Sequence, residues 1–375
     1  MKLRKLNIKK NKKAEIPAFG WIFAMIIGAV ILFIAIFVVV RVTSTQKYKT
    51  NTELAAKLDS VLNPFASVGS IGAIFTDTIT LPSKTQINLV CEPSFLADDD
   101  STNDLGAISL IISSEDELLN SIVKEAEAGQ HKSYNKYIFG NSSMVGKELA
   151  IMSRPLELPF RVDDVIYITT KKYCFENTPD VIKQDISLEI NEQRNPIFDN
   201  IKFYDIDKPE TKCSTDEIRV CFGSCSMKSG NILVKDNSNG NYDIGTVTIQ
   251  GQSQNQGKPF VTLPLMYAAI FSDDMNYYCN LKRLMSKTAI LADIYVKKSD
   301  ILSGQRSCAV QSVRTNLLTL KSQAEKIASN TGVDCSEKLK SKVYNCKKGD
   351  IDFNSFFQTI EAVRTTNKYA SCTVY

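Results

Sequence analysis

Residues 18–40 read AFGWIFAMIIGAVILFIAIFVVV, and no charged residue interrupts them. At about 1.5 Å of rise per residue, a helix of this length crosses a hydrocarbon core of about 30 Å. The run continues into Val-Arg-Val-Thr-Ser, which lacks the small-residue cleavage site of a secretory signal peptide. Residues 18–40 are therefore predicted to be a retained transmembrane helix, with the lipid bilayer as its first partner.

The charges on the two sides of this helix predict its orientation. Seven basic residues and no acid lie in the first thirteen positions: Lys2, Arg4, Lys5, Lys9, Lys10, Lys12 and Lys13. By the positive-inside rule, residues 1–17 form a cytoplasmic tail and the rest is extracytoplasmic, which predicts a single-pass protein of the cell membrane. Without these seven, 38 basic residues stand against 41 acidic ones, so no basic face is expected and nucleic acid is excluded as a partner.

All ten cysteines lie C-terminal to the apolar run. An even number on one side of a membrane segment is typical of an oxidising compartment, where thiols pair. The alternative is a cytosolic protein with buried thiols or metal ligands. Every cysteine is therefore a disulfide candidate: Cys91, Cys174, Cys213, Cys221, Cys225, Cys279, Cys308, Cys335, Cys346 and Cys372.

The pattern beyond the membrane segment predicts an α+β fold stabilised by disulfides. Residues 41–64 read as an amphipathic helical stalk that ends at Asn63-Pro64. Residues 65–258 form a β-rich α+β outer domain, with hairpins expected around Pro82-Ser83 and Asn239-Gly240. Further strands are expected over residues 108–114, 134–140, 147–153, 164–176, 201–206 and 216–222, and a helix over residues 113–129.

Residues 259–375 are predicted to be a helical outer domain. The helical patterns cover residues 265–302, 305–330, 336–345 and 353–369, and Ser303-Gly304 is short enough to fold the first two into an antiparallel hairpin. In that hairpin Cys279 would lie level with residue 328, close to Cys335, at the start of the next helix. The expected disulfide is therefore Cys279 with Cys335.

Few residues in the chain suggest chemistry. The single histidine, His131, lies in a polar stretch, and no hydrolase, zinc-protease, phosphate-loop or dinucleotide motif is present. The acidic loop with Asp98, Asp100 and Asp104 could gather calcium, although a solvated loop is the favoured reading, and no other cofactor or metal is expected. The cluster of Cys213, Cys221 and Cys225 could be a metal knuckle or a redox pair, but structural disulfides are favoured.

Two further motifs concern partners and modification. Gly20, Ala24 and Gly28 recur every fourth residue, so they form a stripe through which a second transmembrane helix could associate into a homo-oligomer. Small residues are also common in membrane helices without such a role. Asn141-Ser142-Ser143 is an N-glycosylation tripeptide on the predicted outer side.

Two resemblances enter at the N-terminus. Lys12-Lys13-Ala14-Glu15 resembles the cleavage region of archaeal type IV prepilins, which implies processing between Ala14 and Glu15 and a helix that becomes a filament core. The anchor, IPAFGWIFA at residues 16–24, is similar to that of a family of uncharacterised single-pass membrane proteins from small-genome archaea. This second resemblance implies a location and no activity.

The favoured functional hypothesis is non-enzymatic. It is a membrane-anchored extracytoplasmic protein that binds, adheres or scaffolds in the cell envelope, with an unknown envelope protein or surface ligand as partner. The alternative is a pilin-like filament subunit, cut between Ala14 and Glu15. A second alternative is an envelope enzyme that uses carboxylates, either in the loop from Asp98 to Asp104 or at Asp163-Asp164.

Overall fold

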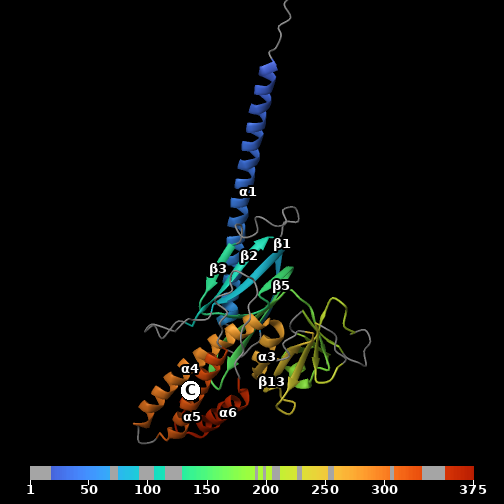
Figure 1. Cartoon of the computed structure of the whole chain (residues 1–375). Helices are drawn as coiled ribbons and strands as arrows, with labels where there is room; N and C mark the ends of the chain where they lie inside the picture. The colour runs from blue at the N-terminus through green and yellow to red at the C-terminus, as the bar shows by residue number, and fades with distance from the viewer. Residues whose placement is uncertain are drawn as a thin grey trace, which may run out of the picture.

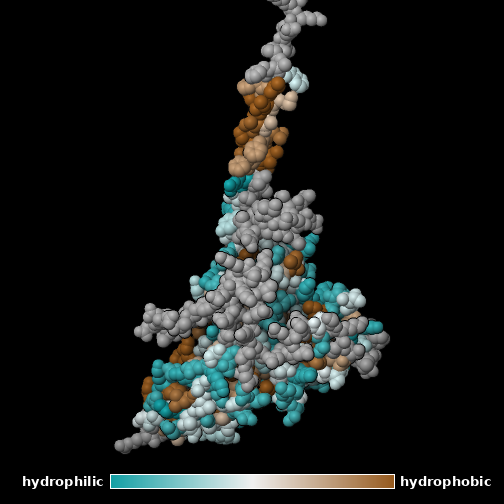
Figure 2. Space-filling model, in the orientation of Figure 1, coloured by the Kyte–Doolittle hydropathy of each residue, from teal (hydrophilic) through white to brown (hydrophobic). Residues whose placement is uncertain are grey.

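The first part of the chain that the structure describes is one long helix. The computed structural model describes residues 18–67, 75–92, 105–114, 129–190, 193–196, 200–204, 212–225, 230–251, 257–304, 308–331 and 351–375. Helix α1 (Ala18–Ser67) has 50 residues and projects from the body of the molecule as a rod (Figure 1). Its segment Gly20–Val39 has a mean hydropathy of 3.3 with none of it buried, and Figure 2 shows it as an apolar column. Among the described helices, only α1 is long and apolar enough to cross a membrane.

The C-terminal part of α1 belongs to a hydrophobic core of the globular body. Asn51, Ala55, Leu58 and Leu62 are buried at spacings of four, three and four residues, so one face of the helix lies on a sheet. Half of the predicted stalk is therefore docked. The predicted end at Asn63-Pro64 is wrong, because the helix continues to Ser67. A proline so near the C-terminus removes one main-chain bond, while the preceding turn is held by packing.

That sheet, sheet A, separates α1 from the C-terminal helices. Its strand order is β3-β2-β1-β5-β6-β4, and only the β4–β6 pair is parallel. Alternate residues face opposite sides: Ile138 and Ile166 belong to the cluster with α1, while Tyr137 and Tyr167 face the other core. The strands are β1 (Phe75–Glu92), β2 (Ala107–Ser114), β3 (Gly129–Ser133), β4 (Tyr137–Phe139), β5 (Ser143–Glu157) and β6 (Arg161–Thr169).

The hairpin predicted around Pro82-Ser83 is wrong. Strand β1 continues through these residues and pairs with β5 on both sides of a register shift between Thr80 and Thr85. Proline lacks the N–H that a regular ladder needs, and an irregular position in a strand tolerates that loss. The turn signal therefore marked a bulge inside one long strand.

Sheet B lies beside the helices and combines parallel and antiparallel pairs. Its order is β10-β7-β11-β12-β13-β14, with the first four strands parallel. The Asn239-Gly240 hairpin is confirmed, since β12 and β13 pair antiparallel and both turn residues have positive φ. The strands are β7 (Tyr173–Glu176), β10 (Ile201–Tyr204), β11 (Ile218–Phe222), β12 (Ile232–Asp236), β13 (Ile244–Ile249) and β14 (Lys258–Val261).

Two more predicted elements are divided in the structure. The strand expected over residues 164–176 is β6 of sheet A and β7 of sheet B, because the chain turns at Lys171-Lys172 and changes sheet. The helix expected over residues 265–302 is α3 (Thr262–Phe271) and α4 (Asp274–Ser303). Asp273 divides them, since its carboxylate accepts the Asn276 N–H and begins a new helix there.

The remaining elements complete the body. Helix α5 (Gln311–Asn330) runs antiparallel to α4, as ion pairs from Arg314 to Asp300 and from Lys321 to Asp293 require. Helix α6 (Phe353–Tyr369) has the predicted bounds. Short α2 (Asp180–Asp185) precedes the ribbon of β8 (Ser187–Ile190) and β9 (Gln193–Pro196). The helix expected over residues 336–345 lies outside the described residues. So does the helix expected over residues 113–129, except for residues 113, 114 and 129.

Buried aromatic rings join both sheets to α3. Tyr167 of β6 contacts Tyr267 edge to face, and Tyr173 of β7 contacts Phe271 in the same way, at centroid distances of 6.2 and 4.9 Å. One hydrophobic cluster includes side chains from sheet A, sheet B and helices α3 to α6. This cluster spans the predicted domain boundary between residues 258 and 259.

Four disulfides are present among the described residues: Cys91–Cys279, Cys174–Cys213, Cys221–Cys225 and Cys308–Cys372. The pairing expected for Cys279 with Cys335 is wrong. The face of α4 that carries Cys279 lies on the end of β1, where Cys91 is 6.1 Å away between Cα atoms. Cys335 and Cys346 lie outside the described residues.

Candidate functional site

Helix α4 carries a row of buried polar side chains that bond one edge of sheet A. Asn276 and Asn280 donate their amide N–H groups to the carbonyls of Gly140 and Ile138, at 3.0 and 2.8 Å. Arg283 continues the row and donates to the carbonyl of Lys136 at 2.9 Å. We call this row, Asn276, Asn280 and Arg283, the α4 seam.

The α4 seam follows from two matching periodicities. Residues four and then three positions apart lie on one face of a helix, and the carbonyls of alternate strand residues point to the same edge. Strand β4 is an edge strand of sheet A, so its outward carbonyls would otherwise lack ladder partners. Side chains of α4 replace the missing strand.

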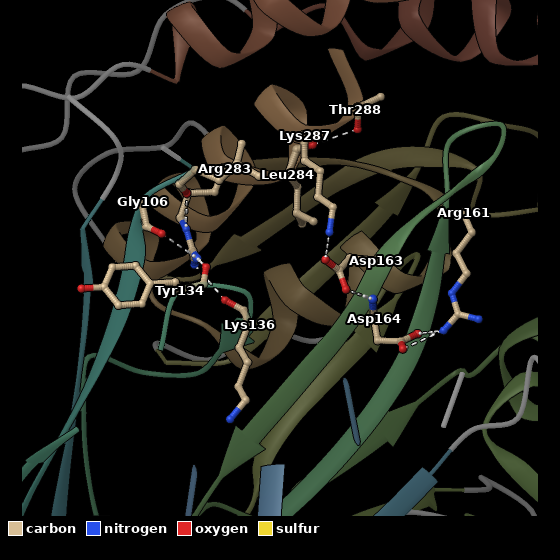
Figure 3. Close-up of polar contacts among 11 residues, drawn as sticks. Gly106, Tyr134, Lys136, Arg161, Asp163, Asp164, Arg283, Leu284, Lys287 and Thr288 are labelled. Carbon is tan, nitrogen blue, oxygen red and sulfur yellow. Dashed lines mark hydrogen bonds and ion pairs between the residues drawn. The ribbon is translucent and has the colours of Figure 1, made fainter. Parts of the chain in front are cut away.

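Arg283 is the centre of the seam. It is 1% exposed, and all five of its N–H groups donate hydrogen bonds. Besides Lys136, the acceptors are the carbonyls of Leu105, Gly106 and Tyr134 and the Asn280 Oδ1 atom. Figure 3 shows Arg283 with Gly106, Tyr134 and Lys136. The guanidinium also lies 4.8 Å from the Tyr137 ring centroid. One side chain thus fixes the chain before β2, the β3–β4 connection and α4.

A pair of carboxylates lies beside the seam on β6. Asp163 forms an ion pair with Lys287 of α4, and Asp164 accepts two bonds from Arg161 at 2.7 and 2.8 Å (Figure 3). Asp163 also accepts the N–H of Asp164. Burial raises the pKa of Asp164, and the neighbouring Arg161 guanidinium opposes that rise.

These carboxylates are the pair named in the enzyme hypothesis, and both already face a cation. Tyr137 lies between the pair and the seam, with the Lys287 ammonium 5.5 Å from its ring centroid. Burial raises the pKa of the Tyr137 hydroxyl far above its ordinary value. A phenol held neutral and carboxylates held by Lys287 and Arg161 form a contact that fastens α4 to β6.

A second polar junction lies at the start of α4. Lys258 of β14 is buried, donates to the Ser272 carbonyl and lies 3.7 Å from an Asp274 oxygen. Burial lowers the pKa of Lys258, and the carboxylates of Asp274 and Asp273 counteract that lowering. Asp273 Oδ2 also accepts the Ser142 N–H at 2.5 Å. The beginning of α4 is therefore tied to both sheets.

A third junction ties sheet A to α2 and α3. Arg154 of β5 forms an ion pair with Asp185, and the Tyr267 hydroxyl donates to the same carboxylate at 2.8 Å. The Arg154 guanidinium also lies 5.9 Å from the Tyr267 ring centroid. These contacts, like the seam, join elements far apart in the sequence.

The other predicted site residues that the structure describes form no cluster with the seam. Gly20, Ala24 and Gly28 are exposed on the projecting half of α1, and nothing lies within 4 Å of a Cβ added at either glycine. His131 is half-buried on β3. Asp98, Asp100 and Asp104, together with the basic tail and the Ala14-Glu15 bond, lie outside the described residues. Within the described ranges, no group of three or more His, Cys, Asp or Glu side chains could hold a metal ion.

Sequence reasoning did not find the α4 seam, although a signal was present. Asn276, Asn280 and Arg283 stand at helical spacing in a segment that also holds Tyr277, Leu281 and Leu284. Large polar side chains aligned on one face of an otherwise apolar helix indicate buried acceptors opposite them. The pattern can show such a stripe but cannot name the carbonyls of β4.

The chain was compared with known proteins. No family model, no curated protein and no solved structure matches it. The function is therefore argued from the residues of this chain.

Proposed function

We propose that the chain is a membrane-anchored protein that displays a rigid domain on the outer face of the cell, where the domain binds or scaffolds another component of the envelope. In this proposal residues 18–40 cross the bilayer, residues 1–17 lie in the cytoplasm, and the partner is an envelope protein or a surface ligand.

The continuity of α1 carries the proposal. The apolar segment Gly20–Val39 has no buried residue, whereas the same helix, one turn after Lys47, supplies Asn51, Ala55 and Leu58 to the core. A helix kinks sharply only where its main-chain bonds are interrupted, so an anchor and a domain that share one continuous helix move together. Such a joint suits a protein that holds a binding surface at a set distance from the membrane.

The contacts of the outer domain also support display rather than catalysis. Its disulfides fit an oxidising compartment, and Cys91–Cys279 joins sheet A to α4 beside the seam. The buried charges at Arg283 and Asp164 are bonded within the protein. A carboxylate enzyme that uses either the Asp98 to Asp104 loop or Asp163-Asp164 remains the second alternative.

Location is tested first, in intact cells that make the full-length chain. A membrane-impermeant amine reagent should label Lys57, which is exposed on α1 beyond the predicted membrane segment. The double substitution Ile27→Lys with Ile31→Lys should release the protein from the membrane, because each lysine costs about 3 kcal/mol near a helix centre. Ala56→Lys with Ser60→Lys is the matched control, on the exposed face of the docked half. Labelling of Lys57 only after lysis would place the domain inside the cell.

Binding is then tested with a photo-crosslinking amino acid at four exposed positions on different elements: Lys57, Tyr134, Ile301 and Tyr369. A binding or scaffold protein should give one reproducible adduct from at least one of them. The buried Ile151 is the control position. Only background adducts, at the level of Ile151, from all four sites would contradict the proposal.

A pilin-like filament subunit is the second candidate, and the projecting half of α1 favours it. Twenty consecutive apolar residues stand clear of the domain, which is what a helix needs to pack among copies of itself in a filament core. The candidate requires a mature N-terminus at Glu15 and a polymer in the envelope fraction. Mass spectrometry of the N-terminal peptide separates the two functions, since Met1 or Lys2 at the mature N-terminus excludes the filament.

A further inference from the structure

The connection between β4 and β5 carries the one N-x-S/T tripeptide of the chain. Asn141, Ser142 and Ser143 occupy it, and Ser143 is the first residue of β5. None of the other asparagines is followed two positions later by Ser or Thr. The tripeptide therefore marks one asparagine as a possible acceptor of an N-linked sugar.

The fold fixes the main chain of this tripeptide from two sides. The Ser142 N–H donates to Asp273 Oδ2 at the start of α4, and the Ser142 carbonyl accepts the Leu89 N–H of β1 at 3.0 Å. Ser143 pairs with Asn88 in the ladder between β5 and β1. Asn141 therefore has a defined place next to the junction of sheet A with α4.

The side chain of Asn141 is left available. Among the described residues nothing bonds its carboxamide, and neither of its polar atoms is buried, although the residue as a whole is half-buried. The nearby asparagines Asn276 and Asn280 differ, because their side-chain amides donate hydrogen bonds to carbonyls of sheet A. Ser143, whose hydroxyl an oligosaccharide transferase must recognise, is exposed and accepts only a 3.3 Å bond from Gln86.

We propose that Asn141 carries an N-linked oligosaccharide, an inference that rests on the outer location proposed above. The co-substrate is an oligosaccharide bound through phosphate to a polyprenyl lipid. A bond forms between the Asn141 Nδ2 atom and the anomeric carbon, the bond from that carbon to the phosphate oxygen breaks, and the amide proton leaves. Transfer precedes pairing of β5 with β1, since both main-chain groups of Ser142 are bonded in the fold.

The test uses the full-length chain purified from its own membranes, or from a host with an oligosaccharide transferase on the outer face. Glycopeptide mass spectrometry should find sugar on Asn141 in the native chain and in Ser143→Thr, which keeps the hydroxyl. Sugar should be lost completely in Asn141→Gln and in Ser143→Ala. A positional control is Asp243→Ser, which creates a second acceptor tripeptide at Asn241, an exposed residue in the β12–β13 loop.

Each outcome decides the inference. Sugar on Asn241 of the Asp243→Ser chain together with a bare Asn141 overturns the proposal and leaves the outer location standing. Sugar on neither asparagine overturns both. Sugar that persists in Asn141→Gln lies elsewhere, and the assignment to Asn141 is wrong.

Discussion

Arg283 is buried, and the structure gives it four main-chain carbonyls to bond. Replacing it with methionine removes the guanidinium donors that these carbonyls bond, so Arg283→Met should lower the free energy of unfolding by about 3 kcal/mol or more. Arg283→Lys should recover only part of this loss, because an ammonium has three donors in place of five. Chemical denaturation of the purified full-length chain measures both changes in the free energy of unfolding.

The matched control for Arg283 is Arg314 of α5, whose ion pair with Asp300 is partly exposed. Arg314→Met should change stability by about 0.5 kcal/mol or less, as exposed ion pairs usually do. Equal losses in the two variants would show that the seam contributes no more than a surface contact.

Asp164 predicts an unusual pH dependence. Its folded pKa is raised above the ordinary value of 3.8, so between the two values the folded state binds more protons than the unfolded state. Stability from this group therefore falls as pH rises through that window. Asp164→Asn removes the effect, so the variant should gain stability relative to the native protein as the pH rises from 3.8. Denaturation at a series of pH values checks the slope.

Asp293 is the control for Asp164, because its pKa is shifted in the opposite direction. Hydrogen bonds from Lys321 and Lys297 lower its pKa, so its contribution is present above the ordinary value of 3.8 and is lost as pH falls through the lowered folded value. Asp293→Asn should therefore be less stable than the native protein near neutral pH and converge with it in acid. Parallel slopes for the two variants would contradict both assignments.

At the scale of elements, the docking of α1 on sheet A depends on a close approach at Gly129. A Cβ at this position would overlap the main chain of Asn51 and Thr52. Since main chain cannot move aside as a side chain can, Gly129→Ala should destabilise the domain by about 1–3 kcal/mol. Hydrogen exchange should rise in residues 51–62 more than in α5.

The matched control for Gly129 is Gly304, where an added Cβ meets only the Ile301 carbonyl at 3.4 Å. Gly304→Ala should leave both stability and exchange in residues 51–62 unchanged. If Gly129→Ala behaves in the same way, β3 can shift and α1 is not seated where the structure places it.

The elements that local sequence predicts are those with local causes. Asn239-Gly240 forms its hairpin because both residues tolerate positive φ, and α6 begins at an Asp352 cap that its own sequence supplies. The hairpin predicted at Pro82 was wrong because the conformation there is set by the pairing of β1 with β5, about 60 residues later in the chain. The disulfide predicted for Cys279 was wrong for the same reason, since its partner lies 188 residues earlier on another element.

The candidate site divides in the same way. The stripe of Asn276, Asn280 and Arg283 can be read from helical spacing, and the antiparallel pairing of α4 with α5 from the short connection at Ser303-Gly304. The acceptors cannot, because the carbonyls of Lys136 and Ile138 carry no side-chain signature and become available only when β4 takes the edge of sheet A. Features that depend on long-range strand pairing, such as these acceptors, cannot be predicted from one sequence.

At the scale of the whole molecule, forces on the domain can reach the apolar segment of α1 through a series of stiff joints. Sheet A lies between α1 and α4, Cys91–Cys279 and the α4 seam fix that packing, and Cys308–Cys372 fastens the start of α5 to the segment after α6. In this series, the side chains that the structure describes on α1 between Val39 and Asn51 are exposed. The rigidity of the display therefore depends on helix continuity there.

Thr45→Pro tests that continuity. Proline at position 45 removes the bond to the Arg41 carbonyl and its ring clashes with that group, at a local cost of about 3 kcal/mol, while the docked face begins only at Asn51. Spin labels on unnatural amino acids at Phe33 and Lys57 should give one narrow distance distribution near 36 Å in the native chain, from 24 residues of helical rise. Thr45→Pro should shorten and broaden it without moving the thermal midpoint of the domain, whereas Thr45→Ala should change neither. A broad distribution in the native chain would mean that anchor and domain move independently, and the proposed rigid display would lose the observation that supports it.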